Sequence, residues 1–419
     1  MKPPPLRDDC FAMPRGVDWT PVDQALAQLR AVLRPVVAQH DVPLHGAVGD
    51  VLAADVIAPA DHPPFMNAAV DGYGFNHANL PTGEEIALPL VAGRSAAGQV
   101  YSGTVPMGHG VRILTGGAIP QGVDTVILQE DVNLDGDHIY FRAGLKRGAN
   151  TRPKGEDITK GAVVLPKGRK LSAVDIGVLS SVGVARVRVF QRLRVGVLST
   201  GDELVDSATP KQKGQIFDAN RPMLLGALRQ WGYDAVDLGI QADDRGVIRQ
   251  ALNHAAQQVD VILTSGGASA GDEDHISKLL GDEGNLQNWR IAIKPGRPLA
   301  LALWRGVPVF GLPGNPVAAM VCAALFAWPA FCALSGQGWR QPQSYFAPAA
   351  FSKNKKDGRR EYLRARLNDA GDVEVFASEG SGRISGLSWA DGLIELGHGA
   401  ENIQRGDLVK FIPFGSLST

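Results

Sequence analysis

Apolar residues recur at helical spacing near the start of the chain. Between Val22 and Gln39 they lie three or four positions apart, at Leu26, Leu29, Val32, Leu33 and Val36. This period is typical of a helix with one buried face. Pro35 interrupts the pattern, because a proline inside a helix removes a backbone donor and clashes with the preceding turn. We therefore expect one kinked helix or two short helices here.

From about residue 55 to residue 147, short β-type runs punctuated by glycine and proline replace the helical period. EIALPLVAG, GHGVRILTGG and DTVILQEDV are examples, and such runs predict strands. A helical pattern returns in LSAVDIGVLSSVG, where Ser172 is predicted to cap the helix and Gly183 to end it. We expect a β-rich domain of residues 58–147, inserted into a discontinuous helical linker domain of residues 18–57 and 148–190.

Strand and helix patterns alternate from residue 191 to residue 336. LRVGVLST, DAVDLGI and VDVILTS read as strands, DDRGVIRQALNHAAQQ reads as a helix, and a further helix has Pro222 in its first turn and Gly232 after its end. This alternation predicts a doubly wound parallel-sheet α/β domain that binds ligands beyond the carboxyl ends of its strands. Residues 337–419 contain strand-like runs and are expected to form a small C-terminal β-barrel domain, so the fold class is multidomain α/β plus β.

Composition narrows the class of protein. A chain of 419 residues is expected to form two to four domains, and the balance of 42 Lys and Arg against 43 Asp and Glu argues against a nucleic-acid or membrane partner. Cys10, Cys322 and Cys332 have no metal-binding spacing, so we expect neither a zinc site nor a disulfide framework. The N-terminus lacks a signal-peptide core, and the apolar run VAAMVCAALFAWPAFCAL is broken by Pro329, which favours a buried helix. We expect a cytoplasmic protein.

The stretch VDVILTSGGASAGDEDHI combines an anion-binding pattern with acidic residues. Its apolar strand opens into a turn typical of a backbone-amide cradle for an anion, formed by Thr264, Ser265, Gly266 and Gly267. Three carboxylates follow within a few residues, in GDEDH. They would repel a phosphate unless a positive group stands between them.

Glu203, Asp243 and Asp274 each come at or just after the end of a predicted strand of the same sheet. Any one of them could simply cap a helix or complement its dipole. Three at one edge, beside a phosphate-type loop, suit Mg²⁺ about equally well, because hard cations bind carboxylates together with substrate phosphate oxygens. The residues alone leave both interpretations open.

Basic residues follow in RIAIKPGRPLALALWRGVPVFGLPGNP. Arg290, Lys294 and Arg297 could supply positive charge to an oxyanion, and Gly296 would allow close approach of the backbone. GLPGNP by itself predicts a strand-to-helix turn with proline at the helix start. Asp71 in MNAAVDGYGF by itself predicts a tight turn.

Taken in order, VDGYGF, RILTGGAIPQGVDTVILQED, GEDI, VLSTGDEL, GQIFDANRPML, TSGGASAGDEDHI, AIKPGRPLA and GLPGNPVAA resemble the molybdopterin molybdenumtransferase family, which includes MoeA and the E domain of gephyrin. The resemblance implies a homodimer of four-domain subunits that inserts molybdate into adenylylated molybdopterin. It also implies Mg²⁺-dependent release of AMP and an α/β domain similar to that of the molybdopterin adenylyltransferases. The implied partners are such an adenylyltransferase upstream and apo molybdoenzymes or their chaperones downstream.

The same resemblance implies roles for individual residues. Asp71 and Thr115 look like site residues offered across the dimer, and Asp157 matches an acid of the family. Glu203, Asp243 and Asp274 look like the catalytic and metal-binding acids around nucleotide and magnesium. The positions that look like binding residues for the pterin, its phosphate and molybdate are Thr264, Ser265, Gly266, Gly267, Ser269, Gly271, Arg290, Lys294, Arg297, Pro313, Gly314, Asn315 and Pro316.

Some positions depart from the family pattern. Val70 and Gly74 replace the usual Met and Ala, Gly117-Ala118 replaces Ala-Pro, and Arg290 stands where Lys is common. None of these changes removes an acid or the phosphate loop, so we expect activity, with an altered anion preference as the alternative. Two other functions are weighed against insertion. One is adenylylation of molybdopterin by ATP, which the extra domains disfavour, and the other is a scaffold, for which the chain supplies no further domain.

Overall fold

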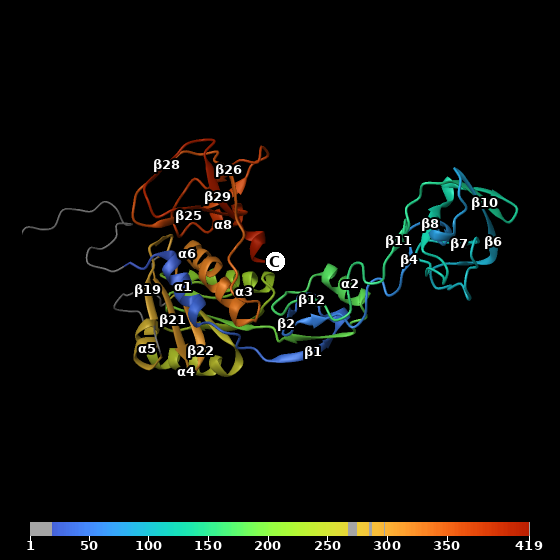
Figure 1. Ribbon diagram of the computed structural model, residues 1–419. Helices are drawn as coiled ribbons and strands as arrows, with labels where there is room; N and C mark the ends of the chain where they lie inside the picture. The colour runs from blue at the N-terminus through green and yellow to red at the C-terminus, as the bar shows by residue number, and fades with distance from the viewer. Residues whose placement is uncertain (1–18, 267–274, 285–286, 297, 419) are drawn as a thin grey trace, which may run out of the picture. The chain divides into compact units, whose positions relative to one another are not determined.

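The computed structural model describes residues 19–266, 275–284, 287–296 and 298–418. The chain forms two compact units (Figure 1). The large unit comprises Met1–His40, Gly49–Ala53 and Val189–Thr419, and the small unit comprises Asp41–Val48 and Ala54–Arg188. The boundaries of the four domains expected from the sequence stay predictions.

A six-stranded sheet in the order β8-β5-β7-β6-β10-β9 forms the core of the small unit. Its strand β5 (Gly72–Phe75) is buried along its whole length. Gly72 is required there, because an added Cβ would lie 1.8 Å from the carbonyl oxygen of Ile127. The other strands are β6 (Glu85–Ser95), β7 (Gly110–Ile113), β8 (Thr125–Leu128), β9 (Asn133–Asp135) and β10 (His138–Arg142), with short 3-10 turns at His77–Asn79 and Gln129–Asp131. The short apolar runs therefore do form strands.

Two-stranded sheets and one helix complete the small unit. β11 (Thr151–Arg152) pairs with β4 (Asn67–Ala68), and β12 (Val163–Leu165) pairs with β3 (Val56–Ile57); a 3-10 turn spans Leu44–Gly46. The helix α2 spans Ala173–Ser181. Ser172 caps it, because the Ser172 hydroxyl accepts the Asp175 N–H while the Asp175 carboxylate accepts the Ser172 N–H. The predicted cap at Ser172 is therefore confirmed. Gly183 follows the helix with a φ of +83°, as expected of a residue that ends a helix.

A three-stranded sheet in the order β1-β13-β2 is built from the segments where the chain passes between the units. Its strands are β1 (Gln39–Pro43), β13 (Arg186–Phe190) and β2 (Val51–Leu52). The helix before it, α1 (Val22–Val32), ends short of Pro35. The expectation of helix as far as Gln39 is therefore wrong, because the residue before a proline is driven out of the helical conformation. The chain continues instead as an extended segment into β1.

The large unit contains the doubly wound sheet, in the order β17-β14-β18-β22-β21-β19. The first four strands run parallel to one another, and β21 pairs antiparallel with both of its neighbours, β22 and β19. Their bounds are β14 (Arg194–Thr200), β17 (Asp234–Gln241), β18 (Val261–Ser265), β19 (Gln287–Arg290), β21 (Pro298–Trp304) and β22 (Val307–Leu312). A two-stranded ribbon, β15 (Leu204–Val205) with β16 (Ile216–Phe217), follows β14. The alternation seen in the sequence is thus confirmed as an α/β sheet.

Helices cover both faces of this sheet. α1, α3 (Asn220–Gln230) and the helical stretch of residues 316–334 pack against one face. α4 (Arg245–Gln258) and α5 (His275–Glu283) pack against the other. Strands buried on both faces are expected to carry continuous apolar runs, and VIL in β18 and VGVL in β14 are such runs, each followed by polar residues at the strand end.

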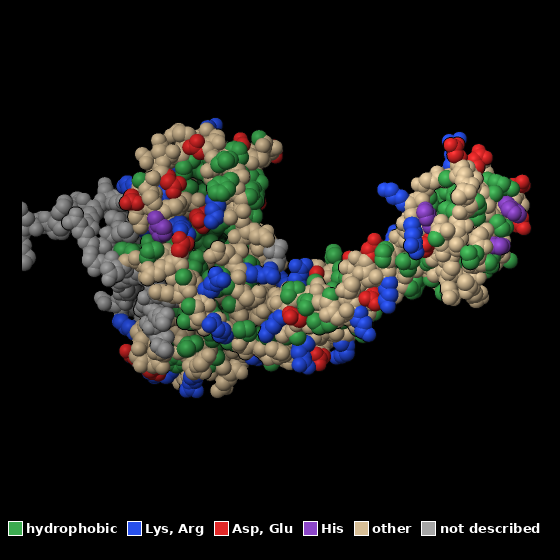
Figure 2. Space-filling view, viewed as in Figure 1, with side chains coloured by type: hydrophobic (Ala, Val, Ile, Leu, Met, Phe, Trp, Pro, Cys, Tyr) green, Lys and Arg blue, Asp and Glu red, His purple; other side chains and the backbone are tan. Residues whose placement is uncertain are grey.

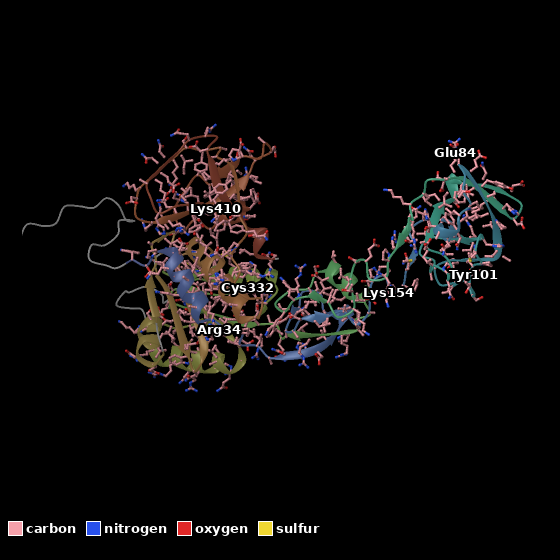
Figure 3. All side chains as sticks on the ribbon, viewed as in Figure 1. Arg34, Glu84, Tyr101, Lys154, Cys332 and Lys410 are labelled. Atoms are coloured by element: carbon pink, nitrogen blue, oxygen red, sulfur yellow. The ribbon has the colours of Figure 1, made fainter. Side chains whose placement is uncertain are left out.

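The stretch Pro316–Leu334 is long and apolar enough to cross a membrane, and 94% of it is buried inside the protein. It comprises α6 (Pro316–Cys322), a π-helical turn (Ala323–Ala327) and α7 (Trp328–Leu334). This burial is typical of a core helix and agrees with the interpretation of the apolar run. Cys332, which belongs to this stretch and is labelled in Figure 3, is buried, and its sulfur contacts the hydroxyl of Tyr233.

A second sheet in the large unit forms the C-terminal β domain. Its strands are ordered β20-β25-β27-β29-β23, with β26 beside β25. β20 (Ile293–Lys294) comes from the KPGRP stretch and pairs in parallel with β25 (Arg360–Leu367). The other elements are β23 (Tyr345–Pro348), β24 (Lys353–Lys355), β26 (Val373–Val375), α8 (Ser385–Trp389), β27 (Gly392–Leu396), β28 (Glu401–Ile403), β29 (Leu408–Pro413) and a 3-10 turn at Phe414–Leu417.

Charged side chains of both signs are interspersed on the face of each unit shown in Figure 2. This distribution matches the nearly balanced composition of 42 basic and 43 acidic residues. A surface of mixed sign gives no long-range attraction for a polyanion.

Candidate active site

The carboxyl ends of the neighbouring parallel strands β14, β18 and β22 lie together at one edge of the doubly wound sheet. Ser199 lies opposite Ser265, and Ser265 lies opposite Leu312, so these three strand ends are direct neighbours. The Gly266 N–H donates to the Leu312 carbonyl at 3.3 Å. The sheet therefore brings together the loops that begin with STGDEL, TSGG and LPGNP.

Gly266 begins the phosphate-type loop with a φ of +91°. An added Cβ would lie 3.1 Å from the Thr200 carbonyl oxygen, so the position disfavours a side chain both by conformation and by space. Thr264 and Ser265 are buried on the strand just before it. The predicted loop residues Gly267, Ser269 and Gly271 lie outside the described residues.

Asn220 ties two of these loops together, and the sequence analysis did not single it out. Its Nδ2 group donates to Ser265 Oγ at 2.8 Å and to the Gly314 carbonyl at 2.6 Å. Only the quoted motif GQIFDANRPML signalled its importance. Asn220 Oδ1, Thr264 Oγ1 and Ser199 Oγ are buried, and no hydrogen-bond partner for them lies within the part of the chain that the structure describes. Unsatisfied buried polar groups are costly, so these three atoms are candidates for hydrogen bonds with the rest of the loop or with a polar ligand.

The predicted acids Glu203 and Asp243 follow neighbouring strands, β14 and β17. Hydrogen bonds join their two loops, from the Gly201 N–H to the Gln241 carbonyl and from the Asp243 N–H to Asp202 Oδ1 at 3.0 Å. The carboxylate of Glu203 folds back over Gly201, where an added Cβ would lie 2.5 Å from Glu203 Oε2. The structure therefore brings these two acid-bearing loops together at the edge.

After β17, the residue that caps the following helix is Asp244 and not the predicted Asp243. Asp244 caps α4, since its carboxylate accepts the Val247 N–H at 2.9 Å. Asp274 lies outside the described residues. Among the residues that are described, His, Cys, Asp and Glu side chains form no group of three that could hold a metal ion. A magnesium site at Glu203, Asp243 and Asp274 therefore stays a prediction.

A half-buried arginine fixes the segment that leads into Asn220. Arg221 is ion-paired with Asp206 at 2.6 Å, with Asp218 at 3.2 Å and with Asp237. Burial works against the charged guanidinium, yet these carboxylates hold the pKa of Arg221 above its ordinary value. The cross-link anchors the ribbon that follows Glu203 to the start of α3.

GLPGNP forms the strand-to-helix turn that its composition predicts. Pro313 and Gly314 lie between β22 and α6, Asn315 occupies the N-cap position, and Pro316 is the first residue of α6. Gly296 packs against this region with a φ of +95°, and an added Cβ there would lie 3.1 Å from Cys322 Sγ. The KPG turn and the GLPGNP turn are thus neighbours.

Among the predicted basic residues, the structure describes the side chain of Lys294. Lys294 Nζ lies 2.6 Å from Glu379 Oε2 and 3.4 Å from Glu361 Oε1. Arg297 and the side chain of Arg290 lie outside what the structure describes. The two glutamates belong to the C-terminal β domain, which sequence reasoning did not connect with the site.

Arg364 holds a loop of the same domain against the start of α6. Arg364 is buried, with 4% of its surface exposed. Its guanidinium donates hydrogen bonds to the carbonyls of Arg383 at 2.6 Å, Gly380 at 3.3 Å and Ser378. The Ser381 carbonyl accepts the Val317 N–H at 3.2 Å. The sequence features that could have indicated this contact are an arginine within the buried strand YLRA and the glycine-rich segment SEGSGR that follows it.

In the small unit, Asp71 and Thr115 are in direct contact. Asp71 Oδ1 accepts hydrogen bonds from the Thr115 N–H and from the Thr115 hydroxyl, both at 2.7 Å. These hydrogen bonds, the backbone one first, hold the pKa of Asp71 below its ordinary value. Asp157 is exposed in another turn, where its N–H donates to the His62 carbonyl at 3.0 Å. The structure therefore joins two of the three candidates in this unit.

Comparison with known families covers nearly the whole chain. Residues 20–183 match the MoeA N-terminal region (domain I and II), residues 196–332 match a probable molybdopterin binding domain, and residues 347–414 match the MoeA C-terminal region (domain IV). The three matches follow one another in the order of that family.

Individual relatives agree with the family match. A molybdopterin molybdenumtransferase of Haemophilus influenzae is 36% identical over 402 residues, which cover 94% of this chain and 99% of the relative. Molybdopterin molybdenumtransferase 2 of Mycobacterium tuberculosis is 31% identical and covers 89% of this chain and 93% of the relative. The crystal structure of a molybdopterin biosynthesis moeA protein from Pyrococcus horikoshii superimposes with a TM-score of 0.82 at 30% identity, covering 94% of this chain and 100% of that one.

Proposed function

We propose that this chain inserts molybdate into a molybdopterin substrate, because it belongs to the molybdopterin molybdenumtransferase (MoeA) family. The product would be molybdenum cofactor, and the enzyme would be a transferase. The observation that supports this most is the junction of the TSGG and LPGNP loops through Asn220, next to the strand end that leads into STGDEL. This junction supports the proposal because the loop expected to bind an anion starts there, next to the loop that carries Glu203.

The finer proposal is that the substrate is adenylylated molybdopterin. Water would cleave its phosphoanhydride, and AMP would leave with the α-phosphate. The two dithiolene sulfurs of the freed molybdopterin would then bind the molybdenum of molybdate, and one molybdate oxygen would leave as water with the two thiol protons. The Gly266 turn would hold the phosphate, since a glycine with positive φ lets backbone N–H groups approach an anion. Lys294, with Arg290 and Arg297, would hold the oxyanion by charge-assisted hydrogen bonds.

Glu203, Asp243 and Asp274 would bind Mg²⁺, because their oxygen donors suit a hard cation and the first two stand on hydrogen-bonded loops. The ion would neutralise charge on the phosphoanhydride and its leaving group. Asp157 would serve as a further catalytic acid. Replacing Asp274 by Ala should then abolish cofactor production in cells that lack the native activity. Unchanged production would contradict the metal-binding role.

We also propose a homodimer in which Asp71 and Thr115 reach the site of the partner subunit. The exposed, hydrogen-bonded pair is a polar arrangement without an obvious use inside its own unit. The enzyme would act in the cytoplasm, receive its substrate from a molybdopterin adenylyltransferase, and deliver cofactor to apo molybdoenzymes or their chaperones. Neither a nucleic acid nor a membrane would be a partner.

A further inference from the structure

Four charged side chains form a closed ring beside the KPG turn. Lys294 Nζ lies 2.6 Å from Glu379 Oε2 and 3.4 Å from Glu361 Oε1. Lys353 Nζ takes the other oxygen of each carboxylate, Glu361 Oε2 at 3.3 Å and Glu379 Oε1. Each carboxylate therefore bridges both ammonium groups.

The backbone positions three members of the ring on strands. Lys294 in β20 lies opposite Glu361 in β25, and Lys353 is the first residue of β24. Glu379 lies instead in the loop whose carbonyls accept hydrogen bonds from Arg364. Its side chain can rotate away without breaking a sheet hydrogen bond.

Glu379 also differs from the other three residues of the ring in how far its side chain is exposed to solvent. Its side chain is 43% exposed, whereas those of Lys294, Lys353 and Glu361 are 10–14% exposed. Separating a buried charge from its partner is costly, and the cost falls when the departing group returns to water. Burial disfavours the charged form of Glu379, but the two lysines hold its pKa below the ordinary value. Glu379 is thus ionised and is the member most easily displaced.

A small cavity adjoins the ring, and Glu379 is one of the residues that line it. Lys294, Pro295, Tyr362, Ser378 and Glu379 contribute to its lining, and its volume is about 20 Å³. That volume holds about one water molecule. A tetrahedral oxyanion has four oxygens and does not fit while Glu379 stays in place.

We propose that Glu379 occupies the position of a substrate oxyanion and that Lys353 is a second anion-binding residue beside Lys294. This inference rests on the proposed function, because it takes Lys294 as a residue that binds the oxyanion. When a tetrahedral dianion enters, the Glu379 carboxylate moves into water. Two ammonium groups and one carboxylate remain, with one net positive charge. The shared chemistry is that of molybdate and of a phosphate group.

Calorimetric titration of the full chain tests the proposal, with molybdate in one arm and inorganic phosphate in the other. Glu379→Gln keeps the side-chain shape and removes the competing charge, so it should tighten binding about three- to tenfold. Lys353→Met should weaken binding by a similar factor, and Lys353→Arg should retain most of it. The arm in which these changes appear identifies which anion the ring accepts.

Glu374→Gln is the matched control. Glu374 pairs with Arg366 at 3.3 Å in the same domain and outside the ring. It should leave anion affinity unchanged in both arms. Thermal melting of each variant separates a loss of folded protein from a loss of binding.

The outcomes separate this inference from the proposed function. Unchanged or weaker binding by Glu379→Gln in both arms, with molybdate-dependent AMP release intact in the unaltered protein, overturns the ring inference alone. Tighter binding by Glu379→Gln without such AMP release in the unaltered protein supports the ring and overturns the proposed function. If Glu379→Gln and Lys353→Met both lower the anion affinity and the melting temperature together, the ring only stabilises the fold. That result also overturns the inference.

Discussion

One oxygen of the Asp71 carboxylate accepts both hydrogen bonds that Thr115 can direct to it, from the backbone N–H and from the hydroxyl, each at 2.7 Å. Asp71 immediately precedes β5 and Thr115 follows β7, two strands that pair in the sheet. The pair is therefore fixed by the sheet, and the second carboxylate oxygen is left for another partner.

Replacing Asp71 by Ala should lower the rate of AMP release by at least about tenfold, because positioned catalytic groups contribute on that scale. Thr115→Ser, which keeps both donors, should lose much less than Thr115→Val, which keeps only the N–H. Steady-state rates and melting curves would be compared for the three variants. The pKa of Asp71 is held below the ordinary value of an aspartate, so Asp71 stays ionised when the pH falls to that ordinary value.

An activity loss near neutral pH that is present in the unaltered protein and absent in Asp71→Ala would contradict an ionised Asp71.

Mixing two inactive variants tests whether the site is shared between subunits. Asp71→Ala and Glu203→Ala subunits, exchanged at equal amounts, should regain about a quarter of normal activity, because half of the dimers are mixed and each has one intact site. Each variant mixed with itself serves as the control. No recovery after proven subunit exchange would mean that both residues act within one subunit.

Asn220→Ala should both destabilise the protein and impair the reaction. It removes hydrogen bonds to Ser265 and Gly314, which should cost about 1–3 kcal/mol of unfolding free energy. Asn253→Ala is a matched control, since it removes one hydrogen bond from Trp304 on the opposite face of the sheet. Denaturant unfolding and AMP release would be measured together. Equal effects of the two variants on the rate would show that Asn220 has no special role in the loops.

Gly266→Ala should impair phosphate binding more than it impairs folding. A side chain at a φ of +91° costs about 1–2 kcal/mol, and its Cβ would also press on the Thr200 carbonyl. Gly239→Ala imposes a similar strain at a φ of +78°, where an added Cβ meets Gln241 Nε2 at 4.0 Å. The KM for adenylylated molybdopterin should rise for Gly266→Ala alone. An equal rise in KM for Gly239→Ala would show that the effect of Gly266→Ala comes from general backbone strain and not from a role in phosphate binding.

The sequence predicted those parts of the fold that depend on local patterns. Strand–helix alternation, the Ser172 cap and the Pro316 helix start each follow from residues that are close together in the chain. The helical segment that begins with α1 was predicted too long. The apolar period continues past Pro35, but a helical backbone cannot continue through the proline without losing a hydrogen bond.

Contacts between distant segments could not be predicted in the same way. Asn220 reaches Ser265 and Gly314 across 45 and 94 positions, and no periodicity encodes such a bridge. The pairing of Lys294 with Glu361 depends on β20 joining the C-terminal sheet, and no strand was predicted at Ile293–Lys294. The Arg364 loop was missed for the same reason, since its role comes from packing against α6.

AMP release from adenylylated molybdopterin tests the central claim most directly. The purified chain would be mixed with this substrate and Mg²⁺, with and without molybdate, and the product would be offered to an apo molybdoenzyme. We predict AMP release that depends on molybdate, followed by activation of the acceptor. No AMP release at any molybdate concentration would contradict the proposed insertase activity.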